Sequence, residues 1–500
     1  MKWLSSFRKW KEQTNTSEEM DTKKTSASLK KNIDFIKKVL NHPSDLRLRG
    51  INEKTILVYL ETLVDQEKLQ ERILSPRASS HENIKETKSK AIKTDDLYQA
   101  VKAILEGHSI LIENGDKQLY VFPTTSAYNR QVDEPDNEKV VRGSHEGFVE
   151  NMIININLIR KRIENPDLCV NYYKLGKKTK TNTSLIYMKG LADPEVVHKV
   201  EQRLKAITSD MIMSPGFVEE FIEDSSFSFF PQTLNTERPD RAMANLMEGR
   251  VLIVTEGSPT VLILPVTFFA FYQSPDDFNS RWIPATYIRL MRLMSFLIAI
   301  GLPSFYIAVA GYHFEVIPDE LVLPLKTSVN EIPYPPLFEA LFMVITIELI
   351  REAGIRLPTS IGQTIGIVGG LVIGDAVVMA GLISNIMIII IALTAISSFV
   401  VPSNEMSTAV RILTFPLMFS AATLGFVGIV FALMFLLIHL CKLESYGTPF
   451  FAPLAPFRWK DLKDTFIRLP LWLMDLRPND PHPQKMRRAQ KSRGWKNDKR

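Results

Sequence analysis

The stretch IGQTIGIVGGLVIGDAVVMAGLISNIMIIIIALTAISSFVV, residues 361–401, decides the fold class, because it contains only one charged side chain, that of Asp375. Two further stretches, 293–312 and 412–441, contain no charged side chain. A helix needs about 20 predominantly apolar residues to cross the hydrocarbon core of a bilayer. The three stretches therefore predict an integral membrane protein, and buried core helices of a soluble protein are the alternative interpretation.

We expect four membrane-spanning helices from these stretches. The middle stretch is long enough for two helices, with a tight turn at Ser384-Asn385 between them. The last helix crosses with a strong tilt or continues into the interface, and Pro416 kinks it or lies at its start. The expected spans are about 290–312, 361–383, 386–401 and 412–440.

Segment 335–353 does not fit this count. Its sequence pattern is apolar and helical, but the segment contains four charged residues, namely Glu339, Glu348, Arg351 and Glu352. Glu348 and Arg351 are three residues apart and can form an ion pair on one helix. We interpret the segment as an amphipathic helix at the membrane interface, or as a helix packed inside a protein assembly. As a fifth full span, the segment would place the basic C-terminal residues outside the cell. A sixth, re-entrant segment would return them to the inside and so allow 335–353 to be a full span.

The distribution of Lys and Arg predicts that both termini lie in the cytoplasm. Arg281, Arg289 and Arg292 precede the first span, and residues 458–500 contain 13 Lys or Arg against 5 Asp or Glu. The loop after the first span is acidic and is expected on the outside. Two cytoplasmic ends require an even number of crossings, which four spans satisfy. The basic N-terminus lacks the apolar region of a signal peptide.

The composition excludes several classes of protein. Its 60 Lys and Arg nearly balance 55 Asp and Glu, which argues against a nucleic-acid-binding chain. Two cysteines, Cys169 and Cys441, in 500 residues exclude a disulfide scaffold. The length predicts several structural units. The expected units are a disordered basic N-terminal arm (1–31), cytoplasmic lobe 1 (32–135), cytoplasmic lobe 2 (140–285), a transmembrane domain (286–441) and a basic cytoplasmic C-terminal tail (442–500).

Both lobes are expected to be α/β or α+β, because strand and helix patterns alternate in them. In lobe 1, two apolar runs flank Asn114-Gly115, which is a strong hairpin signal. In lobe 2, Asp193-Pro194 is typical of a helix start, and Pro239 is expected to open a helix that runs through Asn245. The apolar stretch 251–264 is interrupted by Gly257-Ser258-Pro259, so we predict a hairpin. A membrane span is excluded there because such a turn would leave backbone groups without partners in lipid.

No residue pattern predicts an enzyme, a cofactor or a metal site. No histidine pair has the spacing of metal ligands, and no GxSxG nucleophile motif is present. The glycine-rich run 366–370 lacks the Gly-Lys-Ser/Thr ending of a phosphate loop. We therefore expect a protein without catalytic activity.

A stripe of glycines is the clearest motif of the predicted membrane domain. Gly362, Gly366, Gly370 and Gly374 recur every four residues and so lie along one face of a helix. Small residues at this spacing allow two helix backbones to approach closely in lipid, within one chain or between subunits. Asp375 follows directly, and an intramembrane carboxylate usually faces a bundle interior or water. Asp375 is thus a pore or gate candidate, with an interfacial or paired structural carboxylate as the alternative.

Seven runs, ordered and spaced over residues 140–480, carry a resemblance to a known family. They are Arg142–Glu150 (RGSHEGFVE), Phe230-Pro231-Gln232, Thr236–Asp240 (TERPD), Glu248-Gly249-Arg250, Arg351–Pro358 (REAGIRLP), Ile361–Gly381, and Ser397-Ser398-Phe399 with Pro402. With these runs the chain resembles the A subunit of GerA-type spore germinant receptors of endospore-forming bacteria.

The resemblance implies a subunit that works with a permease-like B subunit and a lipoprotein C subunit in the inner membrane of the spore. It also implies oligomerisation into a nutrient-gated channel for monovalent cations. Where the family has a Met-Glu run, this chain has Met343-Val344, so Glu339 and Glu348 become candidates for the pore or gate. A non-conducting scaffold that assembles the nutrient-binding partner and a small-molecule transporter remain alternatives.

Charged residues of lobe 2 within or near these runs are candidates for contacts between lobes or protomers. Ordinary capping and salt bridging inside one lobe is the alternative interpretation. The basic end of the chain, 486–500, either binds anionic membrane lipid or is a solvated tail. The interface candidates are Arg142, Glu146, Glu237, Arg238, Asp240 and Arg250.

Overall fold

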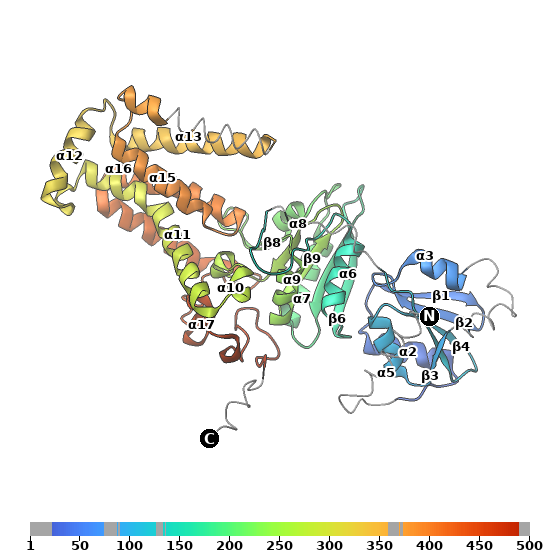
Figure 1. Ribbon diagram of the computed structural model, residues 1–500. Coiled ribbons are helices and arrows are strands. Elements are labelled where there is room, and N and C mark those ends of the chain that lie inside the picture. Colours follow the sequence, from blue (N-terminus) through green and yellow to red (C-terminus); the bar gives the residue numbers. More distant parts are fainter. Residues whose placement is uncertain are drawn as a thin grey trace, which may run out of the picture.

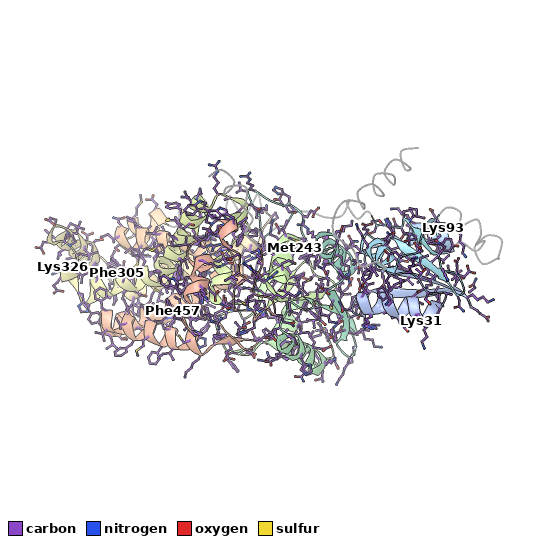
Figure 2. All side chains as sticks on the ribbon, turned by 90° about the horizontal axis from the view of Figure 1, so that it is seen from below. Lys31, Lys93, Met243, Phe305, Lys326 and Phe457 are labelled. Atoms are coloured by element: carbon purple, nitrogen blue, oxygen red, sulfur yellow. The ribbon has the colours of Figure 1, made fainter. Side chains whose placement is uncertain are left out.

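The computed structural model describes residues 23–74, 88, 91–126, 134–135, 137–358, 370 and 374–489. These residues form two lobes, each with a β-sheet, and a helix bundle that follows them in a line (Figure 1). A view from below shows the same order, with Lys31 and Lys93 at one end and Lys326 at the other (Figure 2).

Lobe 1 is a five-stranded antiparallel sheet in the order β1-β2-β4-β5-β3, with α2 and α5 packed on one face. The predicted hairpin at Asn114-Gly115 is confirmed, and Gly115 has a φ of +92° that favours glycine. Its elements are α2 (Leu29–Val39), β1 (Leu46–Asn52), β2 (Thr55–Leu60), α3 (Gln66–Leu69), a π-helical turn (Gln70–Leu74), β3 (Ile92–Thr94), α5 (Leu97–Leu105), β4 (Ser109–Glu113) and β5 (Leu119–Phe122).

Lobe 1 begins earlier in the chain than predicted. Lys24 forms an antiparallel bridge with Asp96, and α2 already starts at Leu29. The expectation of disorder through residue 31 is therefore wrong for residues 23–31, because backbone hydrogen bonds anchor this segment to the lobe. Residues 1–22 lie outside the described part of the chain.

Lobe 2 is a second five-stranded antiparallel sheet, in the order β6-β7-β9-β10-β8. Antiparallel pairing in both sheets makes the lobes α+β. The predicted hairpin and both proline-started helices are confirmed, with the Asp193 side chain accepting from Glu195 N–H at 2.9 Å. The elements are α6 (Met152–Arg162), β6 (Leu168–Leu175), β7 (Thr181–Met188), α7 (Pro194–Ala206), α8 (Pro215–Ile222), β8 (Leu234–Thr236), α9 (Pro239–Glu248), β9 (Val251–Thr255) and β10 (Val261–Leu264).

Helix α6 joins the two lobes through buried polar contacts. Arg160 donates from Nε and Nη2 to the two carboxylate oxygens of Asp45, at 2.7 and 2.8 Å. One turn earlier, the Asn157 amide donates to the carbonyl of Thr62 at 2.6 Å. Because Asp45 and Thr62 belong to lobe 1, these contacts fix the two lobes against each other.

Residues 443–489 fold onto lobe 2, which corrects the expectation of a basic tail at 442–500. Phe450 is fully buried in the same hydrophobic core as Phe230 and Leu252. The Ser445 hydroxyl donates to the carbonyl of Gln232 at 2.8 Å. The prediction of a tail rested on the excess of basic residues, and net charge does not indicate which aromatic side chains are buried. The elements are β11 (Glu444–Ser445), β12 (Thr448–Pro449), α17 (Leu462–Thr465) and two 3-10 turns (Trp459–Asp461, Leu471–Leu473).

The helix bundle follows lobe 2 through the short helix α10. Two of the described helices, α11 and α16, are long and apolar enough to cross a bilayer, and α15 is apolar but shorter. The helices are α10 (Asp276–Asn279), α11 (Trp282–Gly311), α12 (Asp319–Asn330), α13 (Pro336–Arg356), α15 (Asn385–Phe399) and α16 (Asn404–Lys442).

Helix α16 is not straight, because the chain reverses its direction at Gly425. This residue has φ +59° and ψ −136°, far from helical values. A Cβ atom on Gly428 would collide with the carbonyl of Ser420, although eight residues of straight helix span about 12 Å. The expected single span at 412–440 is therefore wrong: 426–442 runs back alongside the first half of the helix. The sequence signal, one glycine in an apolar stretch, does not distinguish a break from a packing contact.

Helix α13 contains the segment that was expected at the interface or inside an assembly. Its residues Glu339, Ala340 and Met343 are buried, and the last two pack in one hydrophobic cluster with residues of α11, α15 and α16. The helix therefore packs within the bundle of this chain. The expected span at 361–383 lies largely outside the described residues, of which 374–379 are helical.

Candidate functional site in the helix bundle

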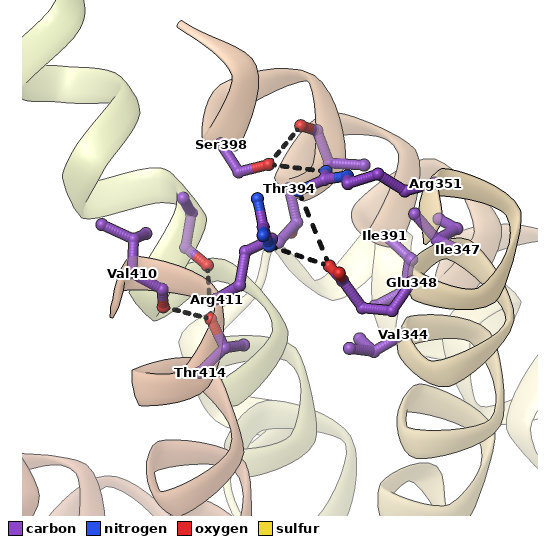
Figure 3. A pocket seen from close by; sticks show the side chains of 12 residues that line it. Val344, Ile347, Glu348, Arg351, Ile391, Thr394, Ser398, Val410, Arg411 and Thr414 are labelled. Carbon is purple, nitrogen blue, oxygen red and sulfur yellow. Dashed lines mark hydrogen bonds and ion pairs between the residues drawn. The ribbon is translucent and has the colours of Figure 1, made fainter. Parts of the chain in front are cut away.

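A cavity of about 30 Å³ lies where α11, α13, α15 and α16 meet (Figure 3). Charged groups are costly inside an apolar helix bundle, so their position identifies a candidate functional site. Glu348 and Arg351 of α13 and Arg411 of α16 line this cavity. The remaining lining is mostly apolar and includes Ala299, Val344, Ile347, Ile391, Ala395 and Val410.

The three charged side chains form one ion cluster. Nε of Arg411 lies 3.2 Å from Oε1 of Glu348, and Nη1 of Arg351 lies 3.7 Å from the same oxygen. The expected pair of Glu348 and Arg351 is thus confirmed, and Arg411 joins it from a distant part of the sequence. Two guanidinium groups and one carboxylate leave a formal charge of +1 in the cluster.

Each arginine has a second set of contacts. Arg351 donates from Nη2 to the hydroxyl of Ser398 at 3.0 Å, and its guanidinium lies 4.1 Å from the ring centroid of Phe399. Arg411 donates to the hydroxyls of Ser407 and Thr408 at 3.2 and 2.9 Å. The Arg351 contacts connect α13 to α15, whereas these Arg411 contacts lie within the start of α16.

The hydroxyl groups around the cavity direct their protons to the backbone. Ser398 donates to the carbonyl of Ala395 at 2.8 Å, and Thr394 donates to that of Ile390 at 2.8 Å. Thr414 has the carbonyl of Ala299 within 3.2 Å. The guanidinium N–H groups are therefore the donors that remain available toward the cavity.

Glu339, a pore or gate candidate, lies apart from this cluster. It is 1% exposed, and its Oε2 accepts a hydrogen bond from the backbone N–H of Ser384 at 3.0 Å. Ser384 is also the N-cap of α15, where its hydroxyl accepts from Met387 N–H at 3.2 Å. The Glu339 carboxylate thus fastens α13 to the start of α15.

Asp375 and the described part of the glycine stripe have open space beside them among the described residues. Asp375 is exposed within the helical residues 374–379. A Cβ atom built on Gly370 or Gly374 would have no neighbour within 4 Å. The two earlier glycines of the stripe, Gly362 and Gly366, lie outside the described residues. In the described part, the stripe does not pack against another helix of this chain.

A second charge cluster joins lobe 2 to the bundle. Asp277 of α10 is buried and pairs with Arg292 at 2.8 Å and with Arg289 at 3.2 Å. Arg289 also lies 3.1 Å from Asp464 of α17. Burial raises the pKa of the Asp464 carboxyl, and the Arg289 guanidinium opposes that rise. Lobe 2, α11 and the C-terminal segment therefore meet in one ionic network.

The six interface candidates make contacts within lobe 2 and the residues that flank it. Arg238 is fully buried, pairs with Asp240 at 2.7 Å, and donates to the carbonyl of Ser144 at 2.7 Å. Glu146 pairs with Arg162, and Glu237 accepts from Asn137. The backbone N–H of Arg142 donates to Asp276 at 3.2 Å, and Arg250 lies 3.8 Å from Glu248. Burial raises the pKa of the Glu248 carboxyl.

The sequence analysis did not identify Arg411 or Ser398 as site residues. An arginine directly before a charge-free stretch was the available signal for Arg411. Ser398 belongs to one of the runs that carry the family resemblance, but only tertiary packing places it beside Arg351. Within the described ranges, no three His, Cys, Asp or Glu side chains are grouped as a metal site would require.

A family model described as Bacillus/Clostridium GerA spore germination protein matches residues 29–480. Spore germination protein A1 of Bacillus subtilis is 41% identical over 77% of this chain and 80% of its own length. Spore germination protein B1 of the same organism is 37% identical over 91% of this chain and 98% of its own length.

Two further similarities come from a membrane protein and from a solved structure. Uncharacterized membrane protein YfkQ of Bacillus subtilis is 38% identical over 91% of each chain. The crystal structure of the N-terminal domain of the A subunit of the Bacillus megaterium spore germinant receptor GerK3 covers 50% of this chain and 99% of that domain. The identity to it is 28% and the TM-score is 0.39.

Proposed function

Because the chain belongs to the GerA family of spore germination proteins, as a GerA-type germinant receptor subunit, we propose that it forms a nutrient-gated channel for monovalent cations as an oligomer. Family membership over residues 29–480 is the observation that carries this proposal. A permease-like B subunit and a lipoprotein C subunit are the proposed partners. The proposed location is the inner membrane of the spore, with both termini in the cytoplasm.

The shared core of lobe 2 and the C-terminal segment supports an even number of membrane crossings. Lobe 2 precedes α11 and residues 443–489 follow α16, yet Phe450 and Phe230 belong to one hydrophobic core. One core cannot lie on both sides of a bilayer. The many Lys and Arg of the C-terminal segment favour the cytoplasmic side.

Four and six crossings both meet this requirement, and the helix bundle favours six. The reversal at Gly425 gives α16 two crossings, and α13 can supply another. Thr414 lies against Ala299, and the Tyr312 hydroxyl donates to the carbonyl of Ala422 at 2.7 Å. These contacts favour a first half of α16 that runs parallel to α11, with the second half returning. The proposed crossings are α11, α13, the segment 361–383, α15 and the two halves of α16.

The open face beside Asp375 supports contact between protomers in the bundle. Gly370 and Gly374 leave room for a close approach by another helix, and the chain itself does not supply that helix within the described residues. Asp375 is exposed next to this face. A ring of such carboxylates, one from each protomer, would favour cations over anions.

Glu339 and Glu348 fit a gate better than a pore lining. Glu339 joins α13 to α15, and Glu348 joins α13 to α16. A gate needs two states that differ in such contacts, so that a partner subunit can shift the balance between them. We therefore assign the two carboxylates to the contacts that hold the closed state.

The test is cation flux through the purified protein in liposomes, with and without the two partner subunits. We expect flux from the wild type to fall in Asp375→Asn and in Gly370→Leu. Asp319→Asn removes an exposed carboxylate from α12 and serves as the control with unchanged flux. Oligomer size is measured in parallel by light scattering.

One result would contradict the channel, and another would contradict the proposed lining of its pore. A folded oligomer that conducts no cations with its partners present would favour the scaffold. Equal cation flux in the wild type, Asp375→Asn and Gly370→Leu would mean that the segment with Gly370 and Asp375 does not line the pore.

A further inference from the structure

Arg351 has more hydrogen-bond donors than its surroundings satisfy. Its side chain is 10% exposed, yet Nε and Nη1 have no hydrogen-bond partner. The 3.7 Å to Glu348 is an ion-pair distance and too long for a hydrogen bond. Buried donors of native proteins are usually paired with protein groups, water or a ligand. These N–H groups border the cavity between the four helices, which points to an occupant.

The charge of the cluster favours an anion as that occupant. Among the described residues, Glu348 is the only carboxylate that lines the cavity, and it faces both Arg351 and Arg411. The cluster therefore keeps one uncompensated positive charge among apolar side chains. Such a charge is stabilised by a counter-ion that reaches the guanidinium groups without displacing Glu348.

The cavity is partly open, and its interior has room for a small species. A water molecule needs about 10–15 Å³ of such space. A cavity of about 30 Å³ thus takes one or two waters or a single small ion. The neighbouring hydroxyls of Ser398 and Thr394 direct their protons to the backbone, so the guanidinium groups are the main donors to it.

We propose that this cavity binds one small inorganic anion, of about the size of chloride, on the guanidinium groups of Arg351 and Arg411. The anion completes the contacts of Arg351 and neutralises the cluster where α11, α13, α15 and α16 meet. Glu348 also belongs to the contacts assigned to the closed state, but unfolding of the chain reports on anion binding without any measurement of ion conduction.

Thermal unfolding of the full chain in phosphatidylcholine nanodiscs tests the proposal. Sodium chloride replaces sodium gluconate at constant ionic strength, and bromide replaces chloride in a parallel series. We expect the wild-type unfolding temperature to rise with chloride and then to saturate, with bromide acting likewise. Arg351→Gln should abolish the rise. Arg356→Gln should keep it, because Arg356 is 76% exposed and pairs with Glu352 outside the cavity.

A second variant keeps the test valid if Arg351→Gln fails to fold. Glu348→Gln removes the carboxylate that competes with the anion and retains both arginines. The chloride concentration that gives half of the rise in unfolding temperature should fall about tenfold in this variant. The reason is that the negative charge of Glu348, which repels the anion, is lost.

Two results would overturn the anion site. If neither chloride nor bromide changes the unfolding temperature of the wild type and of Glu348→Gln, water alone fills the cavity. A rise that follows added phosphatidylglycerol and not chloride would assign the guanidinium groups to a lipid phosphate.

Discussion

At the scale of single residues, the two lobes are joined by a buried ion pair of Asp45 and Arg160, whose side chains are 0% and 2% exposed. We predict that Arg160→Met lowers the free energy of unfolding of the lobes by about 3–5 kcal/mol, because it leaves the Asp45 charge buried and unpaired. The measurement is the urea midpoint of the lobes. The double variant with Asp45→Asn should recover part of the loss.

Arg47 provides the matched control for this prediction. It pairs with Glu61 at 2.7 Å on the surface, where its side chain is 48% exposed. Arg47→Met should cost less than about 1 kcal/mol, because solvent already screens this pair. Similar losses in Arg47→Met and Arg160→Met would show that burial does not decide the strength of the lobe contact.

Glu339 permits a second prediction at this scale. Glu339→Ala removes the acceptor of the Ser384 N–H group, which is then buried without a partner. We expect a loss of about 1–3 kcal/mol, while Glu339→Gln keeps an acceptor oxygen and loses less. Thermal unfolding in detergent compares the two variants. An equal loss in both would mean that the charge, and not the hydrogen bond, holds α13 to α15.

At the scale of elements, the reversal inside α16 depends on one glycine. Gly425 adopts φ +59° and ψ −136°, and a Cβ atom there would lie 2.8 Å from Nε2 of His313. Gly425→Ala should therefore destabilise the bundle by about 1–3 kcal/mol through backbone strain. The measurement is thermal unfolding of the purified protein in detergent.

Gly301 in α11 is the control for the reversal. A Cβ atom there has no neighbour within 4 Å, and the residue lies inside a helix. Gly301→Ala should leave stability unchanged or raise it by about 0.5–1 kcal/mol, since alanine is the better helix former. If Gly425→Ala behaves like Gly301→Ala, α16 tolerates a side chain at its reversal and the strain argument is wrong.

At the scale of the whole molecule, the C-terminal segment completes lobe 2 after the chain has left the bundle. Phe450 is fully buried in the lobe 2 core, and the Gln484 N–H donates to the carbonyl of Leu191 at 2.9 Å. We predict that a chain ending at Lys442 loses the protease resistance of lobe 2, because its core is left open to water. The measurement is limited trypsin digestion of membranes, followed by mass spectrometry.

A chain that ends at Ala489 is the control for this truncation. It keeps every described residue of the C-terminal segment and should resist trypsin like the full chain. Phe450→Ala should behave as a milder form of the first truncation, with a cost of about 3–5 kcal/mol. If the chains ending at Lys442 and Ala489 resist trypsin equally, the C-terminal segment does not stabilise lobe 2, and the prediction is wrong.

The local elements and the family of the protein could be predicted from the amino-acid sequence alone. The hairpin at Asn114-Gly115 and the helix starts at Pro194 and Pro239 were predictable because short-range backbone geometry decides them. The charge-free stretches predicted an apolar helix bundle, since the cost of burying charge is a property of composition. The ordered runs of residues predicted the family, which the match over 29–480 confirmed.

The contacts between distant residues could not be predicted without the folded structure. Arg411 reaches Glu348, and Phe450 reaches the core of lobe 2, across long separations that no local pattern encodes. The reversal at Gly425 also depends on packing, because the same apolar sequence is compatible with one long helix or two short ones. Local propensities fix turns and helix starts, whereas the free energy of long-range contacts is defined only once the chain has folded.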